Sequence, residues 1–120
     1  MKTLYVSDLD GTLLNSSQTT SEYTNNVINT LAEKGVLFSY ATARSYSTAR
    51  RAASGISAQI PLVVYNGTFV IDNLTGERLV SNFFQSDIKN VIQELIDGSV
   101  NPIIYSIIDD KEKFSYIEDK

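Results

Sequence analysis

Two aspartates near the start of the chain, Asp8 and Asp10, are the residues whose types and spacing point most directly to chemistry. They follow a short apolar run over residues 4–7 and precede a glycine and a hydroxyl, Gly11 and Thr12. Side chains at positions i and i+2 of a strand lie on the same face. Both carboxylates are therefore expected to project from the carboxyl end of a strand, where open α/β sheets bind ligands. Because two like charges this close are costly unless a metal ion or a shared proton relieves them, the pair predicts a functional site.

The segment Asp8-Leu9-Asp10-Gly11-Thr12-Leu13-Leu14 resembles the first motif of the haloacid dehalogenase-like phosphohydrolase superfamily. The resemblance implies that Asp8 is a nucleophile that becomes an aspartyl phosphate and that Asp10 is the general acid/base. It also implies a Mg²⁺ ion between the Asp8 carboxylate and the Asp10 backbone carbonyl, and it places Gly11 and Thr12 among the phosphate-binding residues. The residue types suit these roles, since a carboxylate nucleophile divides phosphoryl transfer into two steps and Mg²⁺ prefers oxygen ligands.

A second motif lies where the second predicted strand meets the second predicted helix, over residues 41–45. A hydroxyl beside the free N–H groups of a helix start is well placed to hold a phosphate oxygen. The segment resembles the second motif of the same family, which implies that Thr42 binds the transferring phosphoryl group. Arg44 matches the family arginine that contacts phosphate or substrate, and a guanidinium suits bidentate phosphate binding. Ala43 replaces the glycine of Cof-type members, and Ser45 is expected to cap the helix.

Asn66 is a further candidate, because it follows the third predicted strand and precedes Gly67 and Thr68. Class IIB members of the family often carry N-G-A at this point, which implies that Asn66 lies near the active site. Thr68 departs from that pattern. Asn-Gly is also the commonest pair in hairpin turns, so a plain turn remains an open alternative.

The composition of the 120-residue chain excludes several classes of function. Net charge is −4 and no basic run occurs, which argues against nucleic acid and anionic membranes as partners. The chain contains no cysteine and no histidine, so acid/base chemistry must use carboxylates, lysine or tyrosine. No apolar stretch approaches the ~18 residues of a membrane span, and we expect a cytoplasmic protein with a packed core.

The elements that must position these residues alternate between strand and helix, which predicts a parallel sheet with right-handed crossovers. The predicted elements are a strand over 4–7, a helix from a cap at Thr20 or Ser21 to Gly35, a strand over 36–41, a helix over 45–53, a strand over 62–65, and a hairpin with strands over 68–72 and 77–80. Periodicity predicts that the first helix buries Tyr23, Val27, Ile28 and Leu31.

The pattern restarts after Asn82, which predicts one domain over 1–82 and another over 83–120. The second is expected to contain a helix capped by Ser86, a strand over 103–108, a solvated acidic turn, and a return strand over 114–117. The helix is predicted to bury its apolar residues Ile88, Val91, Ile92, Leu95 and Ile96. This unit resembles the start of the α/β cap inserted after the third core strand in class IIB, Cof-type members of the family.

Two further family motifs are absent from the chain: the third-motif lysine and the G-D-x-x-N-D segment that completes the Mg²⁺ site. We therefore expect a truncated chain that is inactive by itself, with a natural short form that lost catalysis as the alternative. Truncation also predicts open sheet edges at 4–7 and 114–117 that allow self-association.

Together these features predict the first three strands of a Rossmann-like α/β core followed by the start of a cap. The resemblance implies a Mg²⁺-dependent phosphatase that acts on a small phosphorylated metabolite such as a sugar phosphate. Two alternatives stay open. One is a phosphomutase of the same superfamily, since phosphomannomutases share D-x-D-G-T, and the other is a non-catalytic phosphate-binding or regulatory module. Neither the substrate nor the oligomeric state follows from the sequence.

Overall fold

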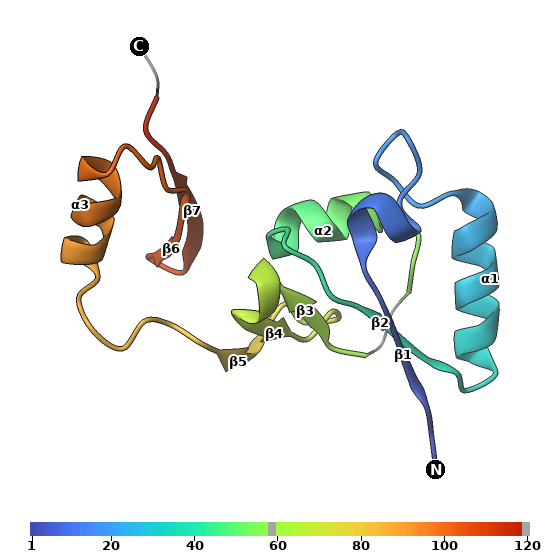
Figure 1. Cartoon of the computed structure of the whole chain (residues 1–120). Helices are drawn as coiled ribbons and strands as arrows, with labels where there is room; N and C mark the ends of the chain where they lie inside the picture. The colour runs from blue at the N-terminus through green and yellow to red at the C-terminus, as the bar shows by residue number, and fades with distance from the viewer. Residues whose placement is uncertain (58–59, 119–120) are drawn as a thin grey trace. The chain divides into compact units, whose positions relative to one another are not determined.

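The computed structural model describes residues 1–57 and 60–118, and its contacts divide the chain into two compact units, Met1–Phe83 and Phe84–Lys120 (Figure 1). The elements of the first unit are β1 (Leu4–Ser7), a helical turn (Leu9–Leu13), α1 (Glu22–Glu33), β2 (Leu37–Tyr40), α2 (Tyr46–Ala52), β3 (Leu62–Val64), a short turn (Tyr65–Gly67), β4 (Phe69–Ile71) and β5 (Arg78–Ser81). The second unit contains α3 (Lys89–Asp97), β6 (Ile104–Ile108) and β7 (Lys111–Ser115). Within the described ranges no helix is long and apolar enough to cross a membrane.

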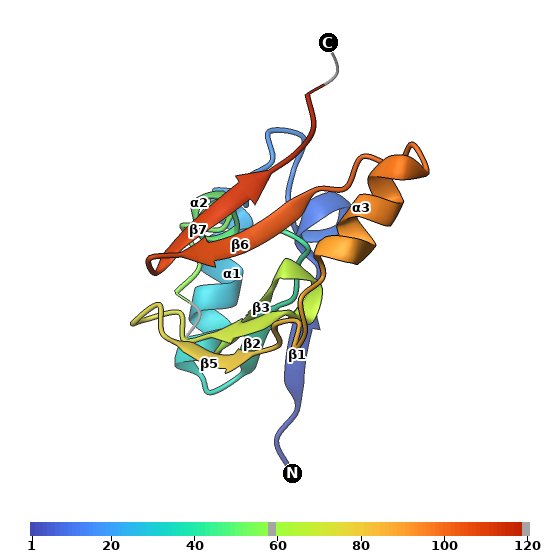
Figure 2. The same cartoon turned by 90° about the vertical axis from the view of Figure 1, so that its left-hand side faces the viewer.

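Two small sheets organise the first unit. Strands β1 and β2 are parallel, with Leu4 opposite Leu37 and Ser7 opposite Tyr40. Strand β3 pairs antiparallel with β4, and β4 pairs antiparallel with β5, which lies at the outer edge of that sheet (Figure 2). The two sheets meet through a parallel bridge between Ala41 and Val63. The predicted α/β class is confirmed, but the third strand is shared with the hairpin, because its three residues pair along their length with β4.

Serine residues begin both helices of the first unit. The Ser21 hydroxyl accepts a hydrogen bond from the Thr24 N–H at 3.1 Å, and the Ser45 hydroxyl accepts one from the Thr48 N–H at 3.2 Å. Each bond satisfies a backbone donor that the first turn of a helix leaves free. Helix α1 stops before Gly35, whose φ of +89° is a left-handed conformation that glycine adopts at no steric cost. The cap at Ser45 and the stop at Gly35 were predicted from the sequence, and of the two predicted candidates for the first cap, Thr20 and Ser21, the structure has Ser21.

The predicted buried face of α1 is wrong. Tyr23 is 78% exposed and Leu31 is 42% exposed, Val27 is also exposed, and Ile28 is half-buried. The sheltered positions next to Ile28 belong to the asparagines Asn25 and Asn29. Apolar periodicity therefore misplaced the face, because the sheltered side of α1 includes the two asparagines together with Ile28.

Asn29 holds the segment that follows α2, and Asn25 lies against it. The Asn29 amide donates to the Gly55 carbonyl at 2.9 Å, and its oxygen accepts from the Ser57 N–H at 2.9 Å. The Asn25 side chain lies so close to Gly55 that a Cβ at that position would overlap its amide group. A larger residue at position 55 would therefore displace the Asn25 side chain, and the two hydrogen bonds of Asn29 tie α1 to the segment that follows α2.

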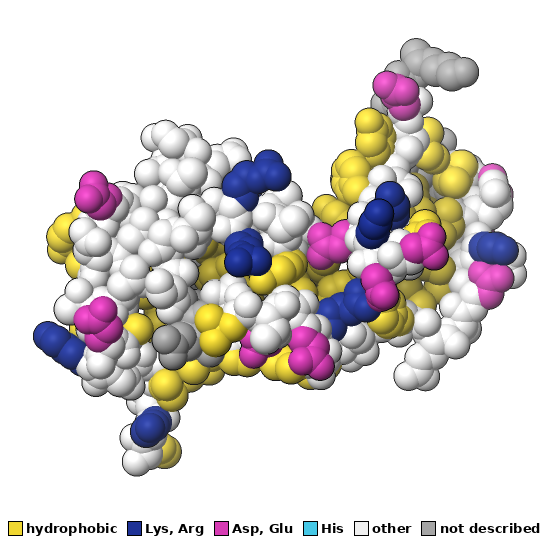
Figure 3. Space-filling view, turned by 180° about the vertical axis from the view of Figure 1, so that it is seen from behind, with side chains coloured by type: hydrophobic (Ala, Val, Ile, Leu, Met, Phe, Trp, Pro, Cys, Tyr) yellow, Lys and Arg dark blue, Asp and Glu magenta, His cyan; other side chains and the backbone are white. Residues whose placement is uncertain are grey.

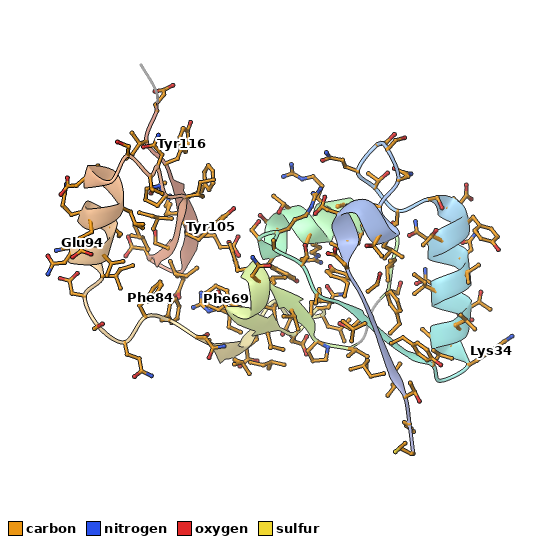
Figure 4. All side chains as sticks on the ribbon, viewed as in Figure 1. Lys34, Phe69, Phe84, Glu94, Tyr105 and Tyr116 are labelled. Carbon is orange, nitrogen blue, oxygen red and sulfur yellow. The ribbon has the colours of Figure 1, made fainter. Side chains whose placement is uncertain are left out.

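The core of the first unit lies around β3 and β4. Leu9, Leu62 and Val64 are fully buried, and Phe69 is 4% exposed. The Phe69 ring packs edge-on against Phe83 with centroids 5.3 Å apart, at the position labelled in Figure 4. Burial of Leu9 matters for the site, because this residue lies between Asp8 and Asp10 and anchors the loop that carries them.

The second unit departs from two sequence predictions. Helix α3 begins after Ile88 without a side-chain cap from Ser86, and the Asp87 carboxylate instead accepts from the Lys89 N–H at 2.9 Å. The return strand begins at Lys111, three residues earlier than predicted. The reason is a two-residue turn, since Asp109 and Asp110 have φ of +51° and +59° and connect β6 to β7 directly.

The predicted buried face of α3 is wrong in most of its positions. Ile88 and Ile92 are half-buried, whereas Val91 is 55% exposed and Leu95 and Ile96 are also exposed. Tyr105 of β6 is likewise exposed, and Glu94 of α3 and Tyr105 lie on opposite sides of this unit (Figure 4). Hydrophobic side chains open to solvent are visible in Figure 3. A helix beside one hairpin offers too little surface to bury the apolar face that the sequence predicts.

Candidate active site

Candidate residues from three strands meet at one edge of the first unit. Asp8 follows β1, Thr42 follows β2, and Asn66 follows β3. With Asp10 they line a cavity of about 540 Å³, whose other lining residues are Ala41, Ala43, Val63 and Gly67. The carboxyl ends of β1, β2 and β3 therefore bring together residues that are up to 58 positions apart (Asn66 minus Asp8) in the sequence.

The loop after β1 gives the two aspartates their places. Asp8 is extended, and its Oδ1 accepts a hydrogen bond from the Leu9 N–H at 2.7 Å. Its other carboxylate oxygen makes no hydrogen bond within the described residues and remains available to a ligand. Gly11 has a φ of +73°, and the left-handed turn at this position allows the chain to fold back after Asp10. Gly11 and the exposed Thr12 do not line the cavity, so the structure gives them a part in shaping the loop.

The Asp10 carboxylate is engaged by Arg44. The guanidinium donates from Nε to Oδ2 at 2.8 Å and from Nη2 to Oδ1 at 2.7 Å, and Nη2 also reaches the Gln18 oxygen at 3.3 Å. This bidentate pair is the geometry in which arginine binds a carboxylate most specifically. The hydrogen bond from Arg44 lowers the pKa of Asp10 below its ordinary value, and the same bond raises the pKa of Arg44.

Arg44 therefore occupies a position that the sequence did not predict. The guanidinium, expected to hold phosphate, faces Asp10, and Arg44 is not among the residues that line the cavity. Gln18, which completes the arrangement, was missed altogether. It sits in the loop before α1 with a φ of +57°, and no motif or periodicity marks it. Contacts between side chains 26 or 34 positions apart leave no local signal in a sequence.

Thr42 is held between the other two loops of the site. Its side chain is buried, its hydroxyl accepts from the Arg44 N–H at 3.1 Å, and its own N–H donates to the Val63 carbonyl at 3.0 Å. The Asn66 N–H in turn donates to the Thr42 carbonyl at 3.0 Å. These backbone bonds fix the Thr42 hydroxyl beside the cavity, and its hydrogen is free to be donated to an anion.

The sequence left open whether Asn66 lies near the active site or belongs to a plain turn. It lies in the turn that joins β3 to β4, and it also lines the cavity. Its φ of +53° is a left-handed conformation that asparagine adopts more readily than most residues. The turn therefore presents the Asn66 side chain at the same edge as Asp8.

The donor chemistry of this edge fits Mg²⁺ in type. Asp8 supplies a carboxylate oxygen and Asp10 supplies a backbone carbonyl, which are the hard oxygen ligands that Mg²⁺ takes together with water and substrate phosphate. Among residues 1–57 and 60–118, no cluster of three or more His, Cys, Asp or Glu residues is placed to hold a metal ion. Asp8 and Asp10 would therefore hold a Mg²⁺ ion only together with ligands from outside the described residues.

The chain is similar to proteins of one family. The family model described as haloacid dehalogenase-like hydrolase matches residues 5–120. A Mycoplasma genitalium protein named as a candidate phosphatase is 33% identical over 94% of this chain and 37% of its own length. The Bacillus subtilis protein named 5-amino-6-(5-phospho-D-ribitylamino)uracil phosphatase is 30% identical over 86% of this chain and 39% of its own length. The chain therefore spans little more than a third of these relatives.

Solved structures share the fold. A haloacid dehalogenase-like hydrolase from B. subtilis superposes with a TM-score of 0.74 at 20% identity, over 89% of this chain and 38% of the other. The agreement at low identity supports the α/β architecture and the order of its elements.

Proposed function

This chain belongs to the haloacid dehalogenase-like hydrolases, and from that premise we propose that the whole protein is a Mg²⁺-dependent phosphohydrolase acting through an aspartyl phosphate on a small phosphorylated metabolite. The observation that carries the proposal is the meeting of Asp8, Asp10, Thr42 and Asn66 at a single cavity. The B. subtilis relative named for a phosphatase of a ribitylamino uracil phosphate supports the substrate class.

In the first step, the free carboxylate oxygen of Asp8 attacks the substrate phosphorus, and the bond from phosphorus to the leaving oxygen breaks. Asp10 gives its proton to that oxygen, so the product leaves as an alcohol. The Leu9 N–H holds the other Asp8 oxygen, which keeps the nucleophile directed at the cavity. Thr42 is placed to donate its hydroxyl hydrogen to a phosphate oxygen.

In the second step, Asp10 removes a proton from water, and the resulting hydroxide attacks the phosphorus of the Asp8 acyl phosphate. The phosphorus–Asp8 bond breaks, inorganic phosphate leaves, and the Asp8 carboxylate is regenerated. Mg²⁺ held by the Asp8 carboxylate and the Asp10 carbonyl would neutralise charge on the transferring group. Asp10 enters this second step ionised, because it gave its proton to the leaving oxygen in the first step.

The first step requires protonated Asp10, which the pair with Arg44 opposes. We infer that the guanidinium moves from the Asp10 carboxylate to the substrate phosphate, the role that the family resemblance implies for Arg44. Phosphate offers the same two acceptor oxygens as the carboxylate that it would replace. The transfer would raise the pKa of Asp10 as substrate binds.

Arg44→Gln in the 120-residue chain is expected to raise the pKa of Asp10 toward its ordinary value, because the donors that stabilise the ionised carboxylate are lost. A pH titration of the Asp10 carboxyl carbon by NMR measures the change. Arg51→Gln removes a guanidinium from the last turn of α2 and should leave the titration unchanged. If the midpoint for Asp10 were the same in the Arg44 variant and the wild type, the ion pair would not exist in solution.

Hydrolysis by the whole protein tests the proposed function. We expect inorganic phosphate to be released from one or more small sugar phosphates in the presence of Mg²⁺, and the release to stop when EDTA removes the metal. Residues 1–120 by themselves should give no release above background, since the described donors form only part of a Mg²⁺ site. Isomerised sugar phosphate without free phosphate would indicate the phosphomutase. Binding of phosphate without turnover by the whole protein would indicate the regulatory module.

A further inference from the structure

A second cavity lies in the first unit and shares no lining residue with the candidate active site. Its volume is about 400 Å³, within the range of pockets that hold small molecules. The end of β2, the last turn of α2 with the residues that follow it, and the connection between β4 and β5 form its walls. The functional residues assigned so far do not account for it.

Tyr40 provides a hydroxyl group in this cavity. The residue is 2% exposed, it lines the cavity, and its hydroxyl makes no hydrogen bond with any described residue. The one buried side-chain nitrogen or oxygen without a partner in the described ranges is Asn25 Oδ1, so the Tyr40 oxygen keeps some contact with solvent and can donate to a molecule in the cavity. Burial raises the pKa of Tyr40 to about 12, so the phenol keeps its proton at physiological pH and acts as a donor.

Arg50 provides the charge. Its guanidinium lies over the Tyr46 ring, 5.9 Å from the centroid, and Nη1 reaches the Tyr46 hydroxyl at 3.5 Å. It makes no ion pair within the described ranges, and no aspartate or glutamate is among the described lining residues. Arg51 shares the favourable position at the carboxyl end of α2 but does not line the cavity. A favourable position at the carboxyl end of α2 is therefore common to both arginines. It does not account for why Arg50 lines the cavity or why no anionic side chain lies beside it there.

We propose that this cavity binds a small metabolite through an oxyanion group, carboxylate or phosphate, with the Arg50 guanidinium as its cation and the Tyr40 hydroxyl as a neutral donor. Arginine matches two oxygens of such a group at once, and a hydrogen bond from a neutral phenol to an ionised acceptor is stronger than one between neutral groups. The hydroxyl of Ser54, another lining residue, adds a second neutral donor. The proposal is independent of the phosphohydrolase function.

NMR titration of the 120-residue chain tests the site, with inorganic phosphate and succinate as separate probes. We expect at least one probe to shift the signals of Tyr40, Arg50 and Ser54, and the probe that does so identifies the group recognised. Tyr40→Phe keeps the ring and removes the donor, and should weaken binding about tenfold or more. Arg50→Gln should abolish it, and the matched Arg51→Gln should leave it unchanged.

A further variant distinguishes binding at this cavity from binding at the Asp8 cavity. Thr42→Val should weaken phosphate binding at the Asp8 cavity while the signals around Tyr40 still respond. The proposal is overturned if neither probe shifts the Tyr40, Arg50 and Ser54 signals in the folded wild type. It is also overturned if Tyr40→Phe binds as tightly as the wild type, because the Tyr40 hydroxyl would then have no part in recognition.

Discussion

Asp8→Asn is expected to lower phosphate release by the whole protein by several orders of magnitude. Asparagine keeps the size of the side chain and the oxygen that accepts from the Leu9 N–H, so the loop should retain its shape. An amide oxygen is a far weaker nucleophile than a carboxylate, and the acyl phosphate cannot form at a useful rate. Steady-state kinetics with a sugar phosphate measures the loss in kcat, and chemical trapping of the phosphorylated protein should succeed for the wild type and fail for the variant.

The matched control for this substitution is Asp109→Asn in the turn between β6 and β7. Asp109 is exposed and has a φ of +51°, which asparagine adopts readily, so this variant should hydrolyse substrate at the wild-type rate. Turnover by Asp8→Asn close to the wild-type rate would rule out the aspartyl phosphate. Loss of turnover in both variants would point to a general effect of the substitutions on folding.

Much of the candidate site followed from the sequence because its signals are local. Asp8 and Asp10 stand two positions apart after a strand, and Thr42 stands two positions after the end of the next strand, where chain direction fixes the edge of the sheet. Ser21 and Ser45 were predictable as caps for the same reason, since the hydroxyl bonds a backbone N–H three positions later. Each of these inferences required only a few neighbouring residues.

The predictions that failed concerned buried helix faces, and these depend on which elements pack against each helix. The apolar positions of α1 predicted a buried face with Tyr23 and Leu31, but Asn25 and Asn29 face the neighbouring loop. Periodicity shows that a helix has an apolar side without showing that anything covers it. The pairing of Arg44 with Asp10 could not be predicted either, because a charged residue can take several partners and the sequence does not rank them.

The unpaired edge of strand β1 is the basis of a prediction about the oligomeric state of the chain. Strand β1 pairs with β2 on one side, and within the described residues no strand pairs with its other side. Leu4, Tyr5 and Val6 are 48%, 57% and 53% exposed. An apolar strand with unpaired backbone groups is a template for another strand. We therefore propose that the 120-residue chain self-associates through β1.

Val6→Lys should shift the chain from oligomers to a monomer, because a lysine on an edge strand opposes pairing with a second edge by charge and by hydration. Sedimentation velocity over a range of protein concentrations measures the change. Val100→Lys is the matched control: Val100 is 50% exposed and lies outside the strands, so the same charge placed there should leave the oligomers intact. A wild-type chain that sediments as a monomer at every concentration would contradict the proposal. Equal dissociation by both variants would mean that net charge, and not the β1 edge, controls association, because the two substitutions add the same charge and differ in whether they interrupt a strand.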